Sequence, residues 1–183
     1  MDIVKVGGSL SRIECQVALV DWLEQRARAG PLVVVSGGGA HADLVRSEQR
    51  RLGFDALTAH RQALLAMEQQ AWWLQSVWAA RHHRHCPVDA SARPGSLWTP
   101  RALIEDPADV EVSWQVTSDS LAAWLAARTR AHTLWLLKSI EGGEAAGTPA
   151  DWAAQGWVDP CFPDYARRSP AAVRLLGRAA WST

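Results

Sequence analysis

Two glycine-rich loops, each following a short apolar segment, are the feature of this sequence that points most directly to chemistry. The first loop lies in Lys5-Val6-Gly7-Gly8-Ser9, and the second in Ser36-Gly37-Gly38-Gly39. Glycines after a strand leave backbone N–H groups open to an anion, and a following helix adds the positive end of its dipole. Together the two loops predict a site for anionic oxygens, for which phosphate is the best fit.

Lys5 strengthens this prediction because it stands inside an apolar run. The chain has only two lysines, Lys5 and Lys138, among 19 basic residues. A lysine in a buried strand is costly unless its ammonium reaches an anion at the end of the strand. Neither loop matches a Walker P-loop or a dinucleotide-binding fingerprint, so each loop by itself is also compatible with a tight turn before a helix.

A third polar group stands at residues 117–120, Thr-Ser-Asp-Ser, directly before a helical pattern. Asp and Ser are common N-caps, but such a group can also hold a lysine ammonium in place. Lys138 and Ser139 end the apolar run that follows. Because the carboxyl ends of parallel strands meet at one edge of a sheet, we expect Lys5, the three glycines, Asp119 and Lys138 to converge there.

The elements that must position these residues alternate between strand and helix, which predicts an α/β fold with a parallel sheet in a single domain, residues 1–183. A helix over 13–29 is expected to bury Ile13, Val17, Val20 and Leu23 or Glu24. A long helix over 56–85 carries an apolar stripe from Leu57 to Trp78, which suits either a core helix or a dimer contact. The other expected strands lie at 3–6, 32–35, 114–117 and 133–137, with short strands and loops over 86–109, and the other helices at 40–52, 121–130 and 165–177.

Composition excludes several classes of protein. The 183 residues are 48% hydrophobic and carry no net charge, which argues against a nucleic-acid-coating protein. Three widely spaced cysteines without a CxxC pair predict neither a disulfide framework nor a zinc ribbon, and favour a cytoplasmic location. The histidines at 82, 83 and 85 and Cys86 lack zinc-type spacing, so no metal site is predicted. No signal peptide or membrane span is expected.

In their order along the chain, these motifs resemble the amino acid kinase family, which includes acetylglutamate, aspartate, carbamate and uridylate kinases. The matching segments lie at 4–10, 34–39, 117–123 and 134–142 and span roughly residues 1–143. The resemblance implies a three-layer αβα sandwich around a mainly parallel sheet, and phosphoryl transfer from ATP with Mg²⁺. Segments 114–120, 137–139 and 158–159 carry a narrower likeness within the family. In these segments the chain looks most like the small kinases of methanofuran-type cofactor biosynthesis, part of C1 metabolism, which phosphorylate aminomethyl-furanmethyl phosphate.

The resemblance also implies roles for particular residues. Lys5 would bridge the transferred phosphoryl group, Asp119 would orient the lysines, and Lys138 would add charge. Arg46 is assigned to the acceptor, although a solvated helix face explains it equally well. The residues assigned to the nucleotide phosphates are Gly7, Gly8, Ser9, Ser118 and Ser139, and those assigned to the acceptor or the γ-phosphate are Gly37, Gly38 and Gly39.

Many members of the family carry a further lysine late in the chain, whereas this sequence has none after Lys138. Lys138 itself, or Arg167, Arg168 or Arg174, would have to supply that charge. Two alternatives therefore stay open: a non-catalytic nucleotide- or anion-binding protein with this fold, and a carboxylate or nucleoside-monophosphate kinase. The acceptor pocket is expected within residues 53–114, and a homodimer or larger homo-oligomer is expected.

Overall fold

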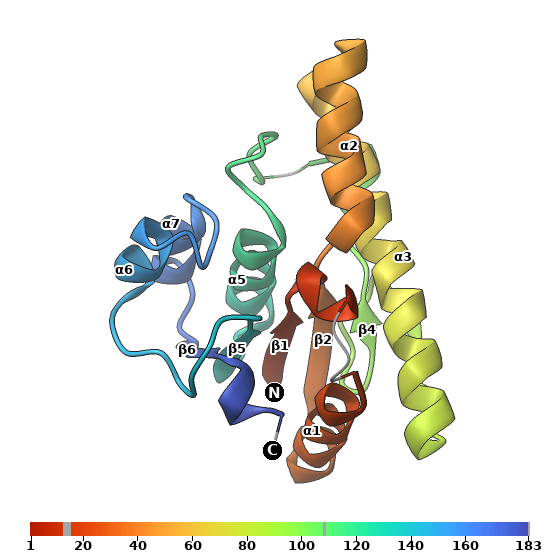
Figure 1. Cartoon of the computed structure of the whole chain (residues 1–183), viewed down its shortest axis with the longest axis vertical. Coiled ribbons are helices and arrows are strands. Elements are labelled where there is room, and N and C mark those ends of the chain that lie inside the picture. The colour runs from red at the N-terminus through yellow and green to blue at the C-terminus, as the bar shows by residue number, and fades with distance from the viewer. Residues whose placement is uncertain (13–15, 108, 183) are drawn as a thin grey trace.

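Short apolar segments form a sheet of six parallel strands in the described part of the chain (Figure 1). The structure is a computed structural model, and it describes residues 1–12, 16–107 and 109–182. The spatial order of the strands is β3-β4-β2-β1-β5-β6. The strands are β1 Asp2–Val6, β2 Leu32–Ser36, β3 Val88–Asp89, β4 Leu97–Trp98, β5 Thr133–Leu137 and β6 Ala172–Leu176.

Helices connect the strands, and local signals set several of their ends. The Asp55 side chain caps α3 by accepting a hydrogen bond of 2.8 Å from the Thr58 N–H, and α2 ends at Gly53, whose φ is 73°. The helices are α1 Gln16–Ala29, α2 Gly39–Leu52, α3 Ala56–His82, α4 Ala102–Glu105, α5 Ser118–Thr129, α6 Pro149–Ala154 and α7 Phe162–Arg167, with 3₁₀ turns η1 Gly8–Arg12 and η2 Arg178–Ala180.

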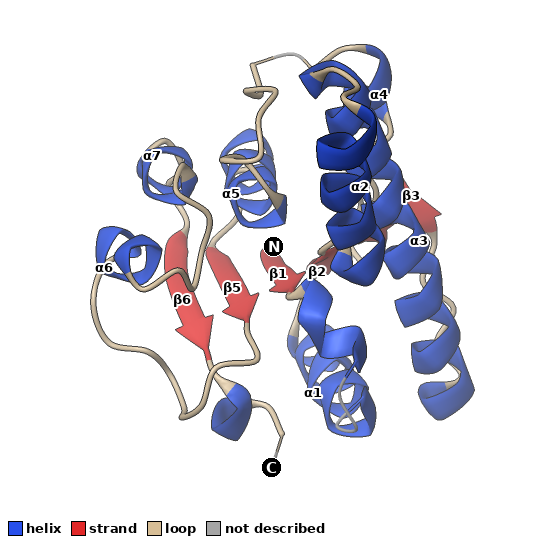
Figure 2. Ribbon diagram, turned by 45° about the horizontal axis from the view of Figure 1, so that its top comes forward, coloured by secondary structure: helices blue, strands red, loops and turns tan. Residues whose placement is uncertain are grey.

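The alternation of side chains along the strands produces two apolar layers, one on each face of the sheet. Ile3 packs with α5, α6 and α7, whereas Val4 and Val6 pack with α1. Helix α3 reaches both layers, because Leu64 in its first half joins one cluster and Trp78 in its second half joins the other. Figure 2 shows the sheet between α5, α6 and α7 on one side and α1 on the other. The predicted αβα sandwich is confirmed.

The carboxyl edge of the sheet brings the loops together. Val6 of β1 is in register with Ser36 of β2 on one side and with Leu137 of β5 on the other. The residues that follow these three strands, Gly7, Gly37 and Lys138, therefore start at the same level of the same edge.

The helix predicted over residues 165–177 is wrong. Helix α7 already ends at Arg167, and residues Ala172–Leu176 form β6, the edge strand beside β5. Pro170 has no N–H with which to continue a helix, and Val173 is β-branched and favours a strand. Pairing with β5 lets Leu175 reach the core, where it is fully buried.

Two other local predictions need correction. On α1 the buried residues are Leu19, Val20, Leu23 and Glu24, whereas Val17 is 50% exposed; Ile13 lies outside the described residues. Residues 114–117 form turns and no strand, and α5 begins at Ser118, with Thr117 as its N-cap, three residues before the predicted start. The long helix α3 follows the predicted stripe, although it ends at His82 and its Leu57 is 37% exposed.

Among the described residues, no helix combines the length and the apolar character needed to cross a bilayer.

Candidate functional site

Two lysines from neighbouring strands meet one buried carboxylate at the carboxyl edge of the sheet. Lys5 points to the same face of β1 as Ile3, toward α5, where its Nζ lies 2.8 Å from Asp119 Oδ1. Lys138, directly after β5, places its Nζ 2.8 Å from Asp119 Oδ2. The Lys5 and Asp119 side chains are almost completely buried. The predicted convergence is therefore observed, and each carboxylate oxygen holds one ammonium.

The charges in this triad shift the pKa values of its members. Burial favours the neutral form of Asp119, but the charges of Lys138 and Lys5 outweigh it and lower the pKa of Asp119 to about 2. Burial also lowers the pKa of Lys138 to about 8, although Asp119 favours its charged form. At neutral pH the triad is thus two cations around one anion, with an excess positive charge facing the loops.

Asp119 lies in the first turn of α5, and another residue caps that helix. The N-terminus of α5 is capped by Asp159, which comes from a distant loop and is buried. Asp159 Oδ2 accepts hydrogen bonds of 3.0 Å from the backbone N–H groups of Thr117 and Ser120, and the two hydroxyls also donate to this carboxylate. Asp119 is therefore free of the capping task and can serve the lysines.

The two glycine loops touch each other backbone to backbone. A Cβ on Gly8 would lie 2.3 Å from the Gly39 nitrogen, and a Cβ on Gly37 would lie 2.7 Å from the Gly8 nitrogen. Gly39 also has a φ of +54°, which side chains disfavour. These three positions require glycine because the loops could not otherwise approach so closely.

The backbone amides of these loops fall into two groups. The N–H of Gly7 donates to the Leu137 carbonyl and the N–H of Gly37 donates to the Val6 carbonyl, each at 2.9 Å, so both extend the sheet. The amides of Gly8, Ser9, Gly38 and Gly39 donate to no described residue. The predicted donors at positions 7 and 37 are thus engaged, and the open amides lie next to them.

Three hydroxyl groups border the same place. Ser9 Oγ and Ser139 Oγ lie 3.1 Å apart, which joins the first loop to the residue after Lys138. Ser118 Oγ lies 3.1 Å from the position that a Gly37 Cβ would take. Hydroxyls and open amides beside a positively charged triad are the groups that bind phosphate oxygens.

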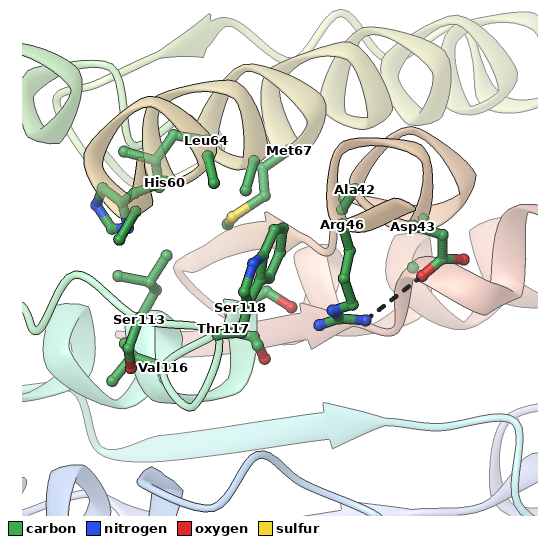
Figure 3. Close-up of a pocket in the computed structure, with 18 of the residues that line it drawn as sticks. Ala42, Asp43, Arg46, His60, Leu64, Met67, Ser113, Val116, Thr117 and Ser118 are labelled. Atoms are coloured by element: carbon green, nitrogen blue, oxygen red, sulfur yellow. Dashed lines mark ion pairs between the residues drawn. The ribbon is translucent and has the colours of Figure 1, made fainter. Parts of the chain in front are cut away.

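A cavity of about 270 Å³ opens beside the loops, between α2, α3 and the segment before α5 (Figure 3). Its walls are largely apolar and include Leu64, Met67 and Val116. At one end Arg46 is stacked over the Trp114 ring, 4.4 Å from its centroid, and lies 3.9 Å from Asp43. Residues 56–67 and 113–114 of the lining fall within the predicted range of 53–114, whereas α2 and the loops supply lining residues that this range did not include.

Sequence reasoning gave no role to Asp159, Trp114 or His60. Asp159 lies 39 residues after Ser120, so nothing local to α5 indicates its capping role. Trp114 and His60 join the lining of the cavity only when α3 and the segment before α5 close it. A run of polar residues at 117–120 was the single signal at this helix start, and it drew attention to Asp119 instead.

The three late arginines are engaged elsewhere. Arg167 pairs with Asp164, Arg168 lies over the Tyr165 ring, and Arg174 pairs with Glu144 while its guanidinium lies 4.7 Å from the Trp135 ring centroid. In the described structure, none of these three arginines therefore adds its charge to that of Lys5 and Lys138 at the loops.

The described residues contain no group of three or more His, Cys, Asp or Glu side chains that could hold a metal ion. His82 Nε2 instead lies 2.6 Å from Asp21 Oδ1, and His85 Nδ1 lies 3.2 Å from Gln75 Nε2. Cys86 is buried, and burial raises the pKa of its thiol to about 11.

No family model and no curated protein matches the sequence. Solved structures do match its fold. Uridylate kinase from Archaeoglobus fulgidus superposes with a TM-score of 0.68 at 18% identity, covering 96% of this chain and 90% of that chain. UMP kinase from Ureaplasma parvum superposes with a TM-score of 0.64 at 12% identity, covering 99% of this chain and 91% of that chain. Aspartate kinase from Synechocystis gives 0.64 at 16% identity, covering 95% of this chain and 37% of that longer chain. The chain therefore shares the amino acid kinase fold with these enzymes.

Proposed function

We propose that this protein is an ATP-dependent phosphotransferase that phosphorylates a small molecule bound in the cavity beside the glycine loops. The observation that carries the proposal is the buried triad of Lys5, Asp119 and Lys138 next to two loops with open amides. Burying two ammonium groups around one carboxylate costs free energy, because one positive charge stays uncompensated. A bound phosphate group would supply the missing negative charge. The shared fold with uridylate and aspartate kinases supports the same assignment.

Phosphoryl transfer suits this arrangement because it needs mainly positioning and charge neutralisation. We assign the open amides of Gly8 and Ser9 to the ATP phosphates, and those of Gly38 and Gly39 to the acceptor side. An acceptor oxygen attacks the γ-phosphorus as the bond to the ADP oxygen breaks, and Lys5 and Lys138 stabilise the charge on the transferred group. An acceptor phosphate is already an anionic nucleophile, so no general base is required.

Magnesium enters this proposal as part of the substrate Mg·ATP. Mg²⁺ keeps several waters and binds substrate phosphates in preference to all-protein cages. The donor set fits that mode, because Asp119 is engaged by both lysines and the described residues offer no cluster of acids for the ion. When bound with ATP, the ion would neutralise part of the phosphate charge.

The finer proposal is that the acceptor is aminomethyl-furanmethyl phosphate, in the biosynthesis of a methanofuran-type cofactor. It rests on the similarity of segments 114–120, 137–139 and 158–159 to the kinases of that pathway. The cavity suits a small acceptor: its volume of about 270 Å³ is slightly below that of ordinary ligand pockets, roughly 300–1,000 Å³, and its apolar walls suit a small flat ring. Arg46 can pair with the acceptor phosphate. UMP is the second candidate, favoured by the fold shared with uridylate kinases.

A different class of function, nucleotide or anion binding without catalysis, is favoured by one observation. The late arginines pair with Asp164 or Glu144, or lie over Tyr165, so none replaces the later lysine of many family members. Calorimetry with Mg·ATP separates the two classes. Binding of Mg·ATP without turnover of either candidate acceptor would favour the binding protein.

The proposal is tested by Lys5→Ala. Loss of one preorganised charge from the transition state should lower kcat by about 10²–10³, measured as ADP formation with aminomethyl-furanmethyl phosphate or UMP as acceptor. The fold should survive because Asp119 keeps Lys138 as its partner, and far-UV circular dichroism checks this. Arg50→Ala removes an exposed cation of α2 and should leave the rate unchanged. A wild-type rate in Lys5→Ala would refute the assignment.

A further inference from the structure

His60 is a buried polar residue in the wall of the cavity, and one of its ring nitrogens has no hydrogen-bond partner in the part of the chain that the structure describes. The residue is 8% exposed, and its Nε2 atom is buried with no hydrogen-bond partner among the described residues. It projects from the first turns of α3. In Figure 3 His60 stands at one end of the labelled lining residues and Asp43 stands at the other, with Arg46 between them. Asp43 lies in α2 shortly after the glycines, so His60 lies at the end of the cavity distal to the glycine loops.

The other buried polar side chains of α3 are satisfied, which makes His60 an exception. Gln70 Nε2 lies 3.1 Å from His41 Nδ1, and Glu68 pairs with Arg101. A buried polar atom without a hydrogen bond destabilises the folded state, and leucine would pack at such a place without that cost. Beside a cavity, the simplest physical explanation of the unpaired atom is that a ligand group supplies its partner.

The surroundings restrict the chemistry of that group. Burial lowers the pKa of His60, so its ring is neutral at pH 7 and offers one N–H donor and one lone pair. Figure 3 shows Ser113 and Val116 on the same side of the cavity as His60, and Ala56 and Ala59 lie within about one turn of it on α3. The charged lining residues, Asp43 and Arg46, come from α2 and lie toward the other end. The distal end therefore suits a hydrogen-bonding group on an apolar body and disfavours an anion, which would need a charged imidazole.

Resting on the proposed function, we infer that His60 is a specificity-determining residue that hydrogen-bonds a polar group on the distal edge of a flat ring. The phosphate of the same ligand lies at Arg46 and the glycine loops. Two acceptors have this chemistry: aminomethyl-furanmethyl phosphate presents an aminomethyl group, and UMP presents the polar edge of uracil.

Matched pairs of ligands test the inference and distinguish the two sources. The first pair is aminomethyl-furanmethyl phosphate and furanmethyl phosphate; the second is UMP and 1-phenylribose 5-phosphate, in which an apolar ring replaces uracil. Calorimetry on the wild-type protein should show at least a tenfold preference for the polar member of one pair, because a site built for a hydrogen bond rejects the analogue that lacks it. His60→Leu should abolish that preference. His60→Gln, which returns an amide group near the place of Nε2, should restore part of it.

A second measurement keeps the test independent of ligand binding. His60→Leu should raise the thermal midpoint of the ligand-free protein by a few degrees, because it removes a buried unpaired atom. If His60 served only to stabilise the fold, His60→Leu would lower the thermal midpoint. His85→Leu makes the same chemical change outside the cavity, and we expect it to leave the ligand preference unchanged.

Each outcome decides the inference. If the wild-type protein binds both members of each pair equally, or if His60→Leu keeps the preference or lowers the midpoint, the inference is wrong while the phosphotransferase proposal stands. If the wild-type protein binds none of the four compounds, the inference and both named acceptors fall together, and the Mg·ATP and Lys5→Ala experiments still decide the proposed function separately.

Discussion

Lys138 carries a charge that ordinary assay conditions can remove. Burial lowers its pKa to about 8 from the usual 10.5, so the free protein loses this ammonium within the accessible pH range. We expect kcat/KM to fall as pH rises through about 8, because the neutral amine no longer stabilises the transferred phosphoryl group. Bound phosphate favours the ammonium, so the corresponding fall in kcat should lie at higher pH. A pH–rate profile from pH 6 to 10 measures both.

The matched variant for this prediction is Lys138→Arg, whose guanidinium stays charged throughout the range. The fall near pH 8 should disappear in this variant; if it persists there, another group causes it. The effect on stability has the opposite sign. Between about 8 and 10.5 the unfolded chain binds more protons at Lys138 than the folded chain, so this residue's contribution to stability rises with pH.

At the scale of residues, the sequence predicted the charged centre better than the hydrogen-bond donors. Lys5 was identifiable because a lysine in an apolar strand is costly, whereas Asp119 and Lys138 were identified by their places at a helix start and a strand end on the expected edge of the sheet. Whether a given backbone N–H is free of a hydrogen bond depends on strand register, which cannot be read from the sequence. The N–H groups of Gly7 and Gly37 are therefore engaged in the sheet, although their glycines were correctly singled out. His60 gave no signal, because its burial comes from distant segments.

At the scale of elements, Asp159 links a distant loop to the start of α5, and Asp159→Asn tests that link. The carboxylate accepts hydrogen bonds from Thr117 and Ser120, so the amide should cost about 2 kcal/mol of stability, measured by urea unfolding. It should also lower kcat, because Asp119 sits in the first turn of this helix and would lose its fixed position between the lysines.

The control for Asp159→Asn is a helix cap far from the lysines. Thr148 caps α6 in a reciprocal capping box with Asp151. Thr148→Ala should cost about 1 kcal/mol and leave kcat unchanged. Equal losses of kcat in the two variants would mean that activity follows global stability and that Asp159 has no positioning role.

Element prediction succeeded where local periodicity and tertiary demand agree, as in β1, β2, β5 and α3. It failed where they compete. Residues 172–176 have no clear alternation, and only pairing with β5 makes them an edge strand. Residues 114–117 are apolar enough for a strand, but they are needed as the turn that closes the cavity over the glycine loops.

At the scale of the whole molecule, the alternation of strands and helices predicted a parallel sheet with helices on its faces, and the resemblance to the amino acid kinase family implied the three-layer sandwich. The cavity was beyond such reasoning. It forms where α2 and α3 stand beside the segment before α5, and its lining comes from four separate stretches of the chain. The size and polarity of the acceptor are therefore restricted by the cavity of the folded molecule, and no single sequence motif indicates them.

The assembled molecule also exposes apolar side chains on its long helices, which leads to a prediction about its oligomeric state. On α3, Leu65 is 44% and Trp72 is 53% exposed, and their spacing of seven residues places them on one helix face. We expect a second copy of the chain to cover this face in a two-fold dimer, since a helix packed against its own copy buries the same residues twice.

Light scattering should give a mass of twice the 20.0 kDa chain for the wild-type protein and that of a single chain for Trp72→Glu. Val17→Glu introduces the same charge at a half-exposed apolar residue of α1, on another part of the surface, and should leave the dimer intact. A wild-type protein that scatters as a single chain at assay concentrations would contradict the dimer. A dimer that survives Trp72→Glu but not Val17→Glu would move the contact from α3 to α1.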